Sequence, residues 1–290
     1  MLKVKVDGAE NRQGPLETIT TLLLSAEGWR DWVQTPSKPF LPPMPALTSI
    51  VVRLPRVRGI NHRIDLATLQ LAIPADMRSR LLNLGLAFDW SARHILKFLQ
   101  QCTNVEVLGL NFGDGAFGEQ SDEDPLMLQF TQQGITLPKI RRVVLFDLPH
   151  NGLHNLRILR LPTQEETFVL FSEKTKDGVI NKARASYLAD FLRGDRTAQS
   201  TIRSLSIENA TFPENTLLEV LRDLSSLQHL SLRNVAIDDN LFHKLKAASL
   251  LPELRTLDIE VSEGGDWDGF MTFIEERGIA LTRYYPFFKD

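Results

Sequence analysis

Three segments near the C-terminus, IRSLSI (residues 202–207), LQHLSL (residues 227–232) and LRTLDI (residues 254–259), share one pattern with aliphatic residues at positions one, four and six. A further copy, VEVLGL, lies upstream at residues 105–110. The C-terminal copies begin at residues 202, 227 and 254, and an amphipathic segment follows each of them after a loop. A pattern that returns at such intervals indicates a protein built from stacked repeats.

The alternation within each copy indicates a short strand. Side chains of a strand point alternately to its two faces, so Leu230 and Leu232 should point into the core and Ser231 should point away from it. The first aliphatic residue enters the same core from the preceding turn. A single unit cannot bury its apolar face alone, so neighbouring units must stack and share one core. We therefore predict an α/β fold, a leucine-rich-repeat solenoid with a curved parallel sheet on its concave side and helices on its convex side.

The same pattern predicts other elements along the chain. Strands are expected near Leu47–Val52, Leu84–Leu86, Leu108–Leu110, Val143–Leu145, Leu205–Ile207, Leu230–Leu232 and Leu257–Ile259, with a first strand at Leu2–Val6. Helices are expected from Gly14 to about Trp32, at Ile64–Leu71, at Ala92–Gln101, at Leu153–Leu161, at Ala183–Arg193 and around Trp267–Ile274. The segment Gly113–Pro125 is expected to be a polar loop, and Tyr284–Phe288 should fold back over the end of the stack. Thr167–Phe171 predicts a strand whose register stays open, because four consecutive residues are apolar.

Composition limits the classes of function. The chain has 290 residues, is 43% hydrophobic and carries a net charge of −3, and its repeats predict one solenoid domain over residues 1–290. The near-balance of charge argues against a general binder of nucleic acid, which usually has a clearly basic surface. One cysteine, Cys102, excludes an intramolecular disulfide and fits a reducing compartment. The chain shows no secretion signal and no apolar run of membrane-spanning length, so we predict a cytoplasmic or nuclear protein.

Three features could carry chemistry, and each has a simpler explanation. The segment Gly113–Gly118 matches the G-x-G-x-x-G pattern of dinucleotide sites, but acidic residues follow it where a phosphate would lie. His150 and His154 have the spacing of a zinc pair, but Asn151 and a glycine interrupt them. Cys102 has His94 two helical turns before it as a possible base, but nothing supplies an orienting group, so an ordinary buried thiol is the simpler explanation. We therefore predict no enzyme activity, no cofactor and no metal site.

The outward-facing strand residues are the better candidates for a functional site. The pattern places nine polar or aromatic side chains there, and we predict that they bind a protein: Arg53, Asn111, Arg142, Phe146, Glu208, His229, Arg233, Asp258 and Glu260. Among them we single out Phe146 with Arg142, because aromatic and arginine side chains are enriched at the energetic centres of interfaces.

Several segments resemble the leucine-rich-repeat region of fungal F-box proteins: RQGPLE (residues 12–17) with WRDW (29–32), FLQQCTNVEVL (98–108) and ITLP (135–138). The resemblance covers nearly the whole chain. In that family an N-terminal F-box binds the Skp-type adaptor of a cullin ubiquitin ligase, and the repeats select the substrate. Here Leu41-Pro42-Pro43 is similar to the opening of an F-box, but Pro45 follows, and no F-box helices precede the repeats. A Skp-type adaptor is therefore expected as a partner only if an F-box exists outside this chain.

Two functions follow from these observations. The first is a protein-binding module that forms the substrate-recognition part of an F-box type ubiquitin-ligase adaptor. The alternative is a stand-alone scaffold or regulator, similar to GTPase-activating or ribonuclease-inhibitor-like repeat proteins, with no role in ubiquitin transfer. Both would bind a protein partner through the face of the sheet. An in-frame F-box upstream of Met1 would favour the first.

Overall fold

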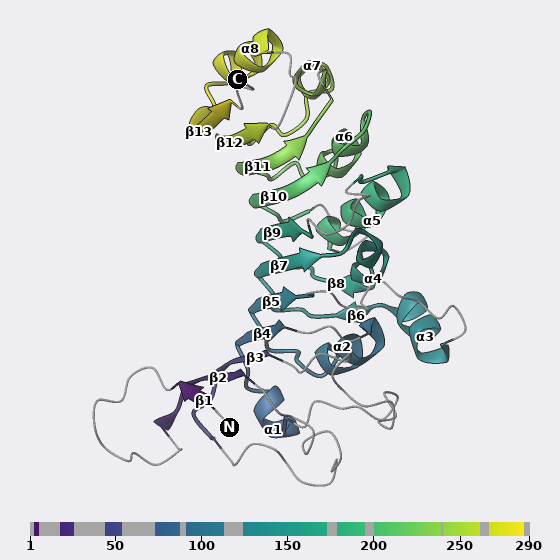
Figure 1. Cartoon of the computed structure of the whole chain (residues 1–290), viewed down its shortest axis with the longest axis vertical. Helices are drawn as coiled ribbons and strands as arrows, with labels where there is room; N and C mark the ends of the chain where they lie inside the picture. The colour runs from purple at the N-terminus through teal and green to yellow at the C-terminus, as the bar shows by residue number, and fades with distance from the viewer. Residues whose placement is uncertain are drawn as a thin grey trace.

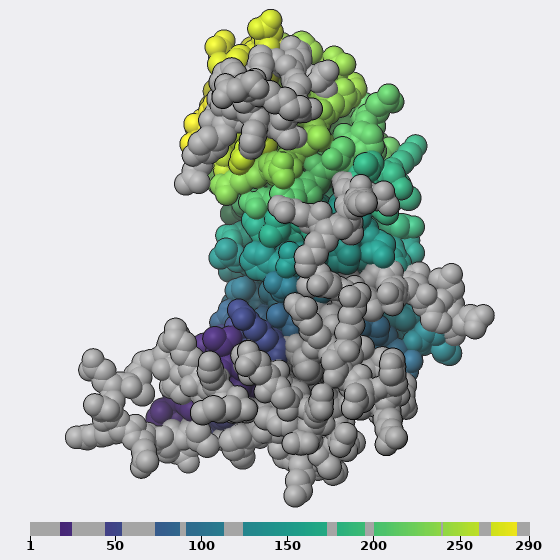
Figure 2. Space-filling model, viewed as in Figure 1, coloured from purple at the N-terminus to yellow at the C-terminus, as the bar shows by residue number. Residues whose placement is uncertain are grey.

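A computed structural model describes residues 3–5, 18–25, 44–53, 73–87, 91–112, 124–172, 179–194, 200–238, 240–261 and 267–286. The strands form one large sheet in which each strand lies beside the previous and the next strand of the repeat series. Figure 1 shows this sheet running along the long axis of the molecule. In Figure 2 the colours follow one another from purple to yellow along the same axis, so successive segments are stacked in chain order.

The sheet is parallel except at its N-terminal edge. Its parallel strands are β2 (Thr21–Ser25), β3 (Ser49–Arg53), β4 (Asn83–Ala87), β5 (Val107–Asn111), β7 (Arg142–Leu148), β9 (Glu166–Phe171), β10 (Ser204–Thr211), β11 (His229–Ala236), β12 (Thr256–Val261) and β13 (Ala280–Pro286). Strand β1 (Lys3–Lys5) pairs antiparallel with β2, and the short strands β6 (Ile135–Thr136) and β8 (Leu159–Arg160) form a separate parallel pair. Within the described residues the chain is therefore an α/β protein with a parallel sheet of ten strands.

The helices connect consecutive strands and lie on one side of the sheet (Figure 1). They are α1 (Ala75–Arg78), α2 (Ala92–Leu99), α3 (Pro125–Gln133), α4 (Leu153–Leu156), α5 (Lys182–Arg193), α6 (Thr216–Leu221), α7 (Leu241–Ala247) and α8 (Trp267–Arg277), with a 3₁₀ turn at His150–Gly152. We call the face of the sheet that points away from these helices the open face.

The core lies between the sheet and the helices and is built from the repeated aliphatic positions. In the copy at residues 227–232, Leu227, Leu230 and Leu232 are at most 2% exposed. The corresponding residues of the predicted copies that begin at positions 47, 81, 105, 140, 202 and 254 are all buried as well. Burial of one such side chain stabilises the fold by about 1.5–3 kcal/mol, which explains why the pattern is repeated so strictly.

A regular set of backbone hydrogen bonds joins each unit to the next. The carbonyl oxygen of Thr48 accepts bonds from the amides of Leu82 and Asn83, at 2.8 and 3.1 Å. The carbonyl of Arg203 accepts in the same way from the two residues that open β11. Each unit thus begins its strand at the same height as its neighbour, and the outward-facing side chains of successive strands fall into rows.

The structure corrects the predicted helix from Gly14 to Trp32. Residues 21–25 form strand β2, and Ile19, Leu22 and Leu24 follow the repeat pattern, with Leu22 and Leu24 at most 2% exposed. The helical interpretation was wrong because Ile19, Leu22 and Leu23 also have the spacing of a helix face. The rest of this predicted helix beyond residues 18–25 lies outside the described residues, as does the helix expected at Ile64–Leu71.

Two further expectations are corrected, and one helix, α3, was not predicted. The helix predicted over Leu153–Leu161 ends at Leu156, and strand β8 follows it. Helix α3 begins at the end of the predicted polar loop, where Asp124 accepts a hydrogen bond from the amide of Leu126 at 2.9 Å. At the C-terminus, residues 284–286 belong to β13, which extends the parallel sheet instead of folding back across its end. Phe287 and Phe288 lie outside the described residues.

The pairing of β9 with β10 fixes the register that the sequence left open. Thr167 lies opposite Leu205 and Val169 lies opposite Ile207, so these side chains point into the core. Thr167 is 3% exposed and Val169 is fully buried. Phe168, which lies between them, therefore points to the open face.

Candidate protein-binding surface

All nine residues of the predicted site lie on the open face. Each one alternates with buried strand residues, as the exposure patterns of β3, β5, β7, β10, β11 and β12 show. They are Arg53, Asn111, Arg142, Phe146, Glu208, His229, Arg233, Asp258 and Glu260. The structure brings four of them together on β10, β11 and β12, and it places Asn111 opposite Phe146 on neighbouring strands. Arg53, Arg142 and His229 lie at separate points along the face.

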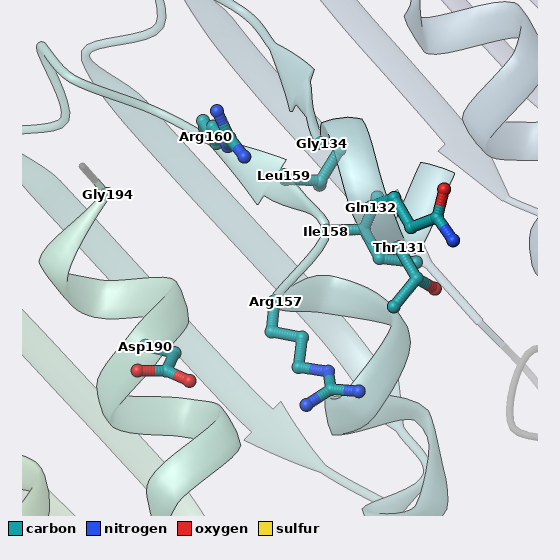
Figure 3. A pocket seen from close by; sticks show the side chains of 9 residues that line it. All are labelled: Thr131, Gln132, Gly134, Arg157, Ile158, Leu159, Arg160, Asp190 and Gly194. Atoms are coloured by element: carbon teal, nitrogen blue, oxygen red, sulfur yellow. The ribbon is translucent and has the colours of Figure 1, made fainter. Parts of the chain in front are cut away.

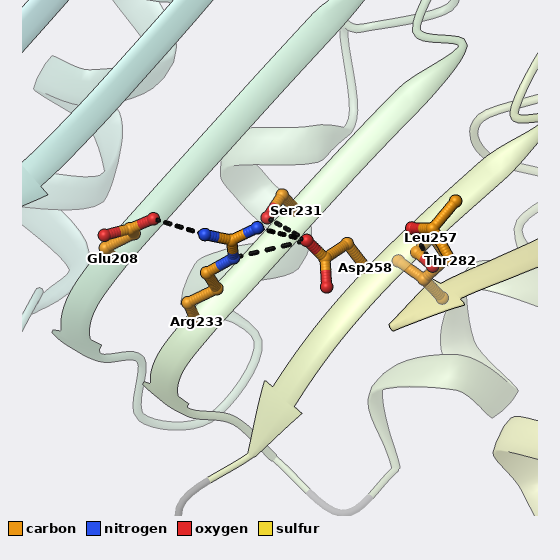
Figure 4. A network of polar contacts seen from close by, with 6 residues as sticks. All are labelled: Glu208, Ser231, Arg233, Leu257, Asp258 and Thr282. Atoms are coloured by element: carbon orange, nitrogen blue, oxygen red, sulfur yellow. Dashed lines mark hydrogen bonds and ion pairs between the residues drawn. The ribbon is translucent and has the colours of Figure 1, made fainter. Parts of the chain in front are cut away.

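The four residues that meet are Glu208, Arg233, Asp258 and Glu260, which we call the acidic cluster. Figure 4 shows the Arg233 guanidinium between two carboxylates. Its Nη2 and Nε atoms lie 2.7 and 3.2 Å from Oδ2 of Asp258, and its Nη1 lies 3.6 Å from Oε1 of Glu208. The Ser231 hydroxyl donates to the same Asp258 oxygen at 3.3 Å, and Glu260 lies beside Arg233 on the next strand.

The acidic cluster contains three carboxylates and one guanidinium, so it carries an excess of negative charge. Burial raises the pKa of Glu208 above its usual value, Arg233 opposes this rise, and Glu260 and Asp258 reinforce it. The pKa of Arg233 is raised mainly by its hydrogen bond to Asp258. The side chains of Glu208 and Asp258 are only 20% and 16% exposed. The negative charge is thus held in fixed positions on a partly desolvated surface.

One row of the N-terminal part of the open face is apolar instead, between polar residues such as Arg142 on one side and Arg53 and Asn111 on the other. Val51, Gly85, Gly109, Val144 and Phe168 lie opposite one another on β3, β4, β5, β7 and β9, and we call this line of residues the apolar row. Val51 is 39% exposed, and the other members are partly exposed. A surface of this kind is what an interface with an apolar partner requires.

Gly109 leaves a gap in the layer of side chains. A Cβ atom added at Gly109 would meet only backbone atoms of β4, the nearest being the Cα of Gly85 at 3.8 Å, so the layer of side chains is open above Gly109. A Cβ atom added at Gly85 would lie 3.0 Å from a methyl group of Val51, so the Val51 side chain covers Gly85. Val51 borders the gap on β3 and Val144 borders it on β7. These two strands lie three spacings apart, which corresponds to about 14 Å.

An aromatic pair closes the apolar row. Phe146 is 39% exposed, and its ring centroid lies 5.5 Å from that of Phe168 at an angle of 53°. On the next strand, Ser206 lies opposite Phe168 and Glu208 lies opposite Leu170. The open face therefore changes from apolar to polar between β9 and β10.

The structure separates the pair that the sequence singled out. Arg142 and Phe146 both point to the open face, but they lie four positions apart on β7, which is about 13 Å, with Val144 between them. The Nε of Arg142 lies 3.5 Å from a carboxylate oxygen of Glu166, whereas Phe146 packs on Phe168. The two side chains thus make separate contacts within the protein, and their binding to a partner stays a prediction.

Sequence analysis missed the apolar row because it selected mainly polar outward positions. A signal was available: the residue between the last two aliphatic positions of each copy always points outward. At residues 51, 85, 109 and 144 that residue is Val, Gly, Gly and Val. Four such residues in neighbouring strands predict an apolar row.

The residues considered for catalysis or metal binding have structural roles. His150 is 2% exposed and stacks on Phe171 with 4.9 Å between ring centroids, and the Nδ1 of His154 donates to the carbonyl of Asn151 at 2.8 Å. Cys102 is 1% exposed, and burial raises the pKa of its thiol to about 12. In the part of the chain that the structure describes, no three His, Cys, Asp or Glu side chains are grouped as a metal site requires. The Gly113–Gly118 segment lies outside that part.

A cavity of about 230 Å³ lies on the helix side, where the C-terminal ends of α3 and α5 meet strand β8. Its lining includes Arg157, Arg160 and Asp190, and Figure 3 shows the two guanidinium groups on opposite sides of it. The Arg157 guanidinium lies 4.6 Å from the centre of the Tyr187 ring, and Asp190 pairs with Arg193 at 3.3 Å. Two of these charged groups thus have contacts within the protein, and the groups do not converge on one ligand position.

Comparisons with known proteins identify no family. No protein-family model matches the chain, and no curated protein has a matching sequence. Among solved structures, the chain aligns with a protein from Bacteroides fragilis with a TM-score of 0.45 and 11% sequence identity. The alignment covers 82% of this chain and 65% of that chain, so this chain spans less than two thirds of the other protein. Among the described helices, none has the length and apolar character needed to cross a membrane.

Proposed function

We propose that this chain is a protein-binding repeat module that recognises its partner through the open face of the sheet. The observation that carries the proposal is the apolar row, which presents Val51, Val144 and Phe168 together with exposed Phe146. Large contiguous apolar patches on soluble proteins mark interaction sites, and the exposed apolar side chains of this row lie on adjacent strands. Placement of this surface on adjacent strands of one sheet gives a partner a continuous platform.

The proposed fold family is the leucine-rich-repeat solenoid, in which the open face would be the concave side. The buried aliphatic positions of each unit, the parallel order of the strands and the helices on one side support this assignment. In such solenoids each unit packs only on its neighbours, and the sheet forms an extended binding surface.

The resemblance of the sequence to fungal F-box proteins supports a more specific role, which is selection of the substrate of a ubiquitin ligase. In this role the open face binds the substrate. Contact with a Skp-type adaptor requires an F-box outside this chain. The corresponding compartment is the cytoplasm or the nucleus.

A displayed library of random 16-residue peptides tests the binding function. Peptides selected on the unmodified chain are rebound to Phe146→Glu, which places a charge at the end of the apolar row. Leu128→Glu is the matched control, because Leu128 is 51% exposed on α3, away from the open face. Circular dichroism first verifies that both variants fold.

The selected peptides should bind Leu128→Glu as well as the unmodified chain, and they should lose binding to Phe146→Glu. Selection of no peptide, or of peptides that bind both variants equally, would contradict binding through the open face.

A further inference from the structure

The open face changes its chemistry along a single row of residues. After the apolar row, the same row continues through Ser206 on β10 and Ser231 on β11 to Asp258 on β12. The neighbouring row passes from Leu170 to Glu208 at the same point. A partner that lies across the strands therefore meets apolar side chains first and carboxylates afterwards.

The charge of the acidic cluster favours a cationic partner. Arg233 contacts one oxygen atom of Asp258 and one of Glu208. A carboxylate has about four acceptor sites on its two oxygens, so these groups can accept further donors. Glu260 adds a third carboxylate beside Arg233. Lysine or arginine side chains would offset the excess negative charge, whereas a nucleic acid would bring phosphates against it.

The strand spacing sets the distance between the two parts of the partner. From Gly109 on β5 to Asp258 on β12 there are five strand spacings, which correspond to about 24 Å. From Gly109 on β5 to Glu208 on β10 there are three spacings, or about 14 Å. An extended chain advances about 3.3 Å per residue, so these distances correspond to about four to seven residues.

We infer that the partner is an extended protein segment with an apolar residue above the gap at Gly109, and a basic pair about four to seven residues away above the acidic cluster. This inference rests on the proposed function, because it specifies the partner of the same surface. The apolar side chain occupies the gap between Val51 and Val144, and the basic side chains pair with the carboxylates.

Fluorescein-labelled synthetic peptides test the inference. The first carries a Phe-Leu pair, five Gly or Ser residues and an Arg-Arg pair, and the same composition is also made in the reverse order. Two counterparts replace Arg-Arg by Glu-Glu or by Gln-Gln. Fluorescence anisotropy measures the Kd of each peptide in low and high salt. The Arg-Arg peptide should bind roughly tenfold more tightly than the Glu-Glu peptide, and high salt should reduce this preference.

A matched pair of protein variants separates a local effect from a change in net charge. Glu208→Gln with Glu260→Gln removes two charges from the acidic cluster. Glu214→Gln with Glu253→Gln removes two exposed charges from turns outside the strands. The first variant should weaken the Arg-Arg peptide roughly three- to tenfold and leave the Gln-Gln peptide unchanged, and the second should change neither.

The outcomes separate this inference from the proposed function. If the Arg-Arg and Glu-Glu peptides bind equally and Phe146→Glu abolishes both, the open face binds protein but the basic preference is wrong. Equal effects of the two charge variants would also overturn the inference, because the net charge and not the acidic cluster would then control binding. If the random library yields no peptide that depends on the open face, the proposed function itself fails.

Discussion

Replacement of the buried polar pair Gln164 and Thr167 by apolar residues should stabilise the protein. These residues occupy the first and fourth positions of the β9 copy, where the next copy has Ile202 and Leu205. Gln164 is 1% exposed and Thr167 is 3% exposed. The amide Nε2 of Gln164 donates to the hydroxyl of Thr167, but its Oε1 is buried without a hydrogen-bond partner in the described part of the chain. The double substitution Gln164→Leu with Thr167→Val removes this unpaired acceptor.

The expected gain follows from three terms. Removal of a buried unpaired acceptor is worth about 1–3 kcal/mol, and loss of the hydrogen bond between the two side chains costs about 0.5–1.5 kcal/mol. Additional apolar burial contributes about 0.8 kcal/mol for each added methylene equivalent. The double variant should therefore be more stable by about 1–3 kcal/mol. Thr167→Val alone should be less stable by about 1–3 kcal/mol, because it leaves the buried amide of Gln164 without its partner.

Urea titration followed by far-UV circular dichroism measures these changes. Midpoints are compared only if the slope of unfolding free energy against urea is the same in all variants, since repeat proteins can depart from two-state behaviour. The single variant Gln164→Leu completes a double-mutant cycle. A double variant less stable than the unmodified chain, or two single changes that simply add, would refute the argument, because the two side chains would then not act as a pair.

Three further outcomes are expected from denaturant titrations. Leu230→Ala should lower the unfolding free energy by about 2–5 kcal/mol, whereas Ser231→Ala, which points outward, should change it by less than about 1 kcal/mol; equal effects would contradict the register of β11. Gly109→Ala should raise the unfolding free energy by about 0.4–1 kcal/mol, because the added Cβ would contact no atom closer than 3.8 Å. Gly85→Ala should raise it by less, because the added Cβ would lie 3.0 Å from a methyl group of Val51. Glu208→Gln should raise the unfolding free energy at pH 7 but not at pH 3. Burial raises the pKa of the Glu208 carboxyl, so the folded protein loses stability as the pH rises through this pKa and the carboxyl ionises. Glutamine stays neutral at both pH values and therefore avoids this loss. An equal effect at both pH values would contradict this explanation.

The repeated aliphatic positions made most of the sheet predictable. Copies such as 202–207 and 227–232 combine the period of a strand with the longer period of a repeat, and the two signals together exclude a helix. The copy at Ile19–Leu24 lacked this support, because its neighbours along the chain are irregular and its apolar spacing also fits a helix. The start of α3 had a usable signal: Asp124 caps the helix and Pro125 occupies its first position, an arrangement that favours helix initiation.

Strand β9 shows what the sequence alone could not decide. Gln164 and Thr167 replace the aliphatic residues that mark the other copies, and the residues from Phe168 to Phe171 are all apolar. Either face of such a strand can be buried, so its register depends on the neighbouring strands. In the structure the positions of Leu205 and Ile207 on β10 fix it. Tertiary pairing, and not local pattern, therefore exposes Phe168 on the open face.

The candidate site was predictable in position but not in content. Alternation along each strand identified the outward residues, including all members of the acidic cluster. It could not show that Arg233 lies between Asp258 and Glu208, because this contact depends on the alignment of three strands. Gly85 and Gly109 hold the same position in consecutive copies, so their pairing was predictable, but the Val51 side chain that covers Gly85 was not.

The separation of structural and recognition residues on each strand has a consequence for specificity. The inward side chains and the backbone bonds between units hold the sheet together, so outward side chains can change with little effect on the fold. In this chain they change abruptly between Phe168 on β9 and Ser206 on β10. A compact apolar partner would contact only the first part, and a purely basic one only the second. A segment that crosses the boundary in an extended form contacts both, and the strand spacing then dictates the interval between its apolar and basic residues. Selectivity of this surface should therefore depend on the order and spacing of partner residues more than on their composition.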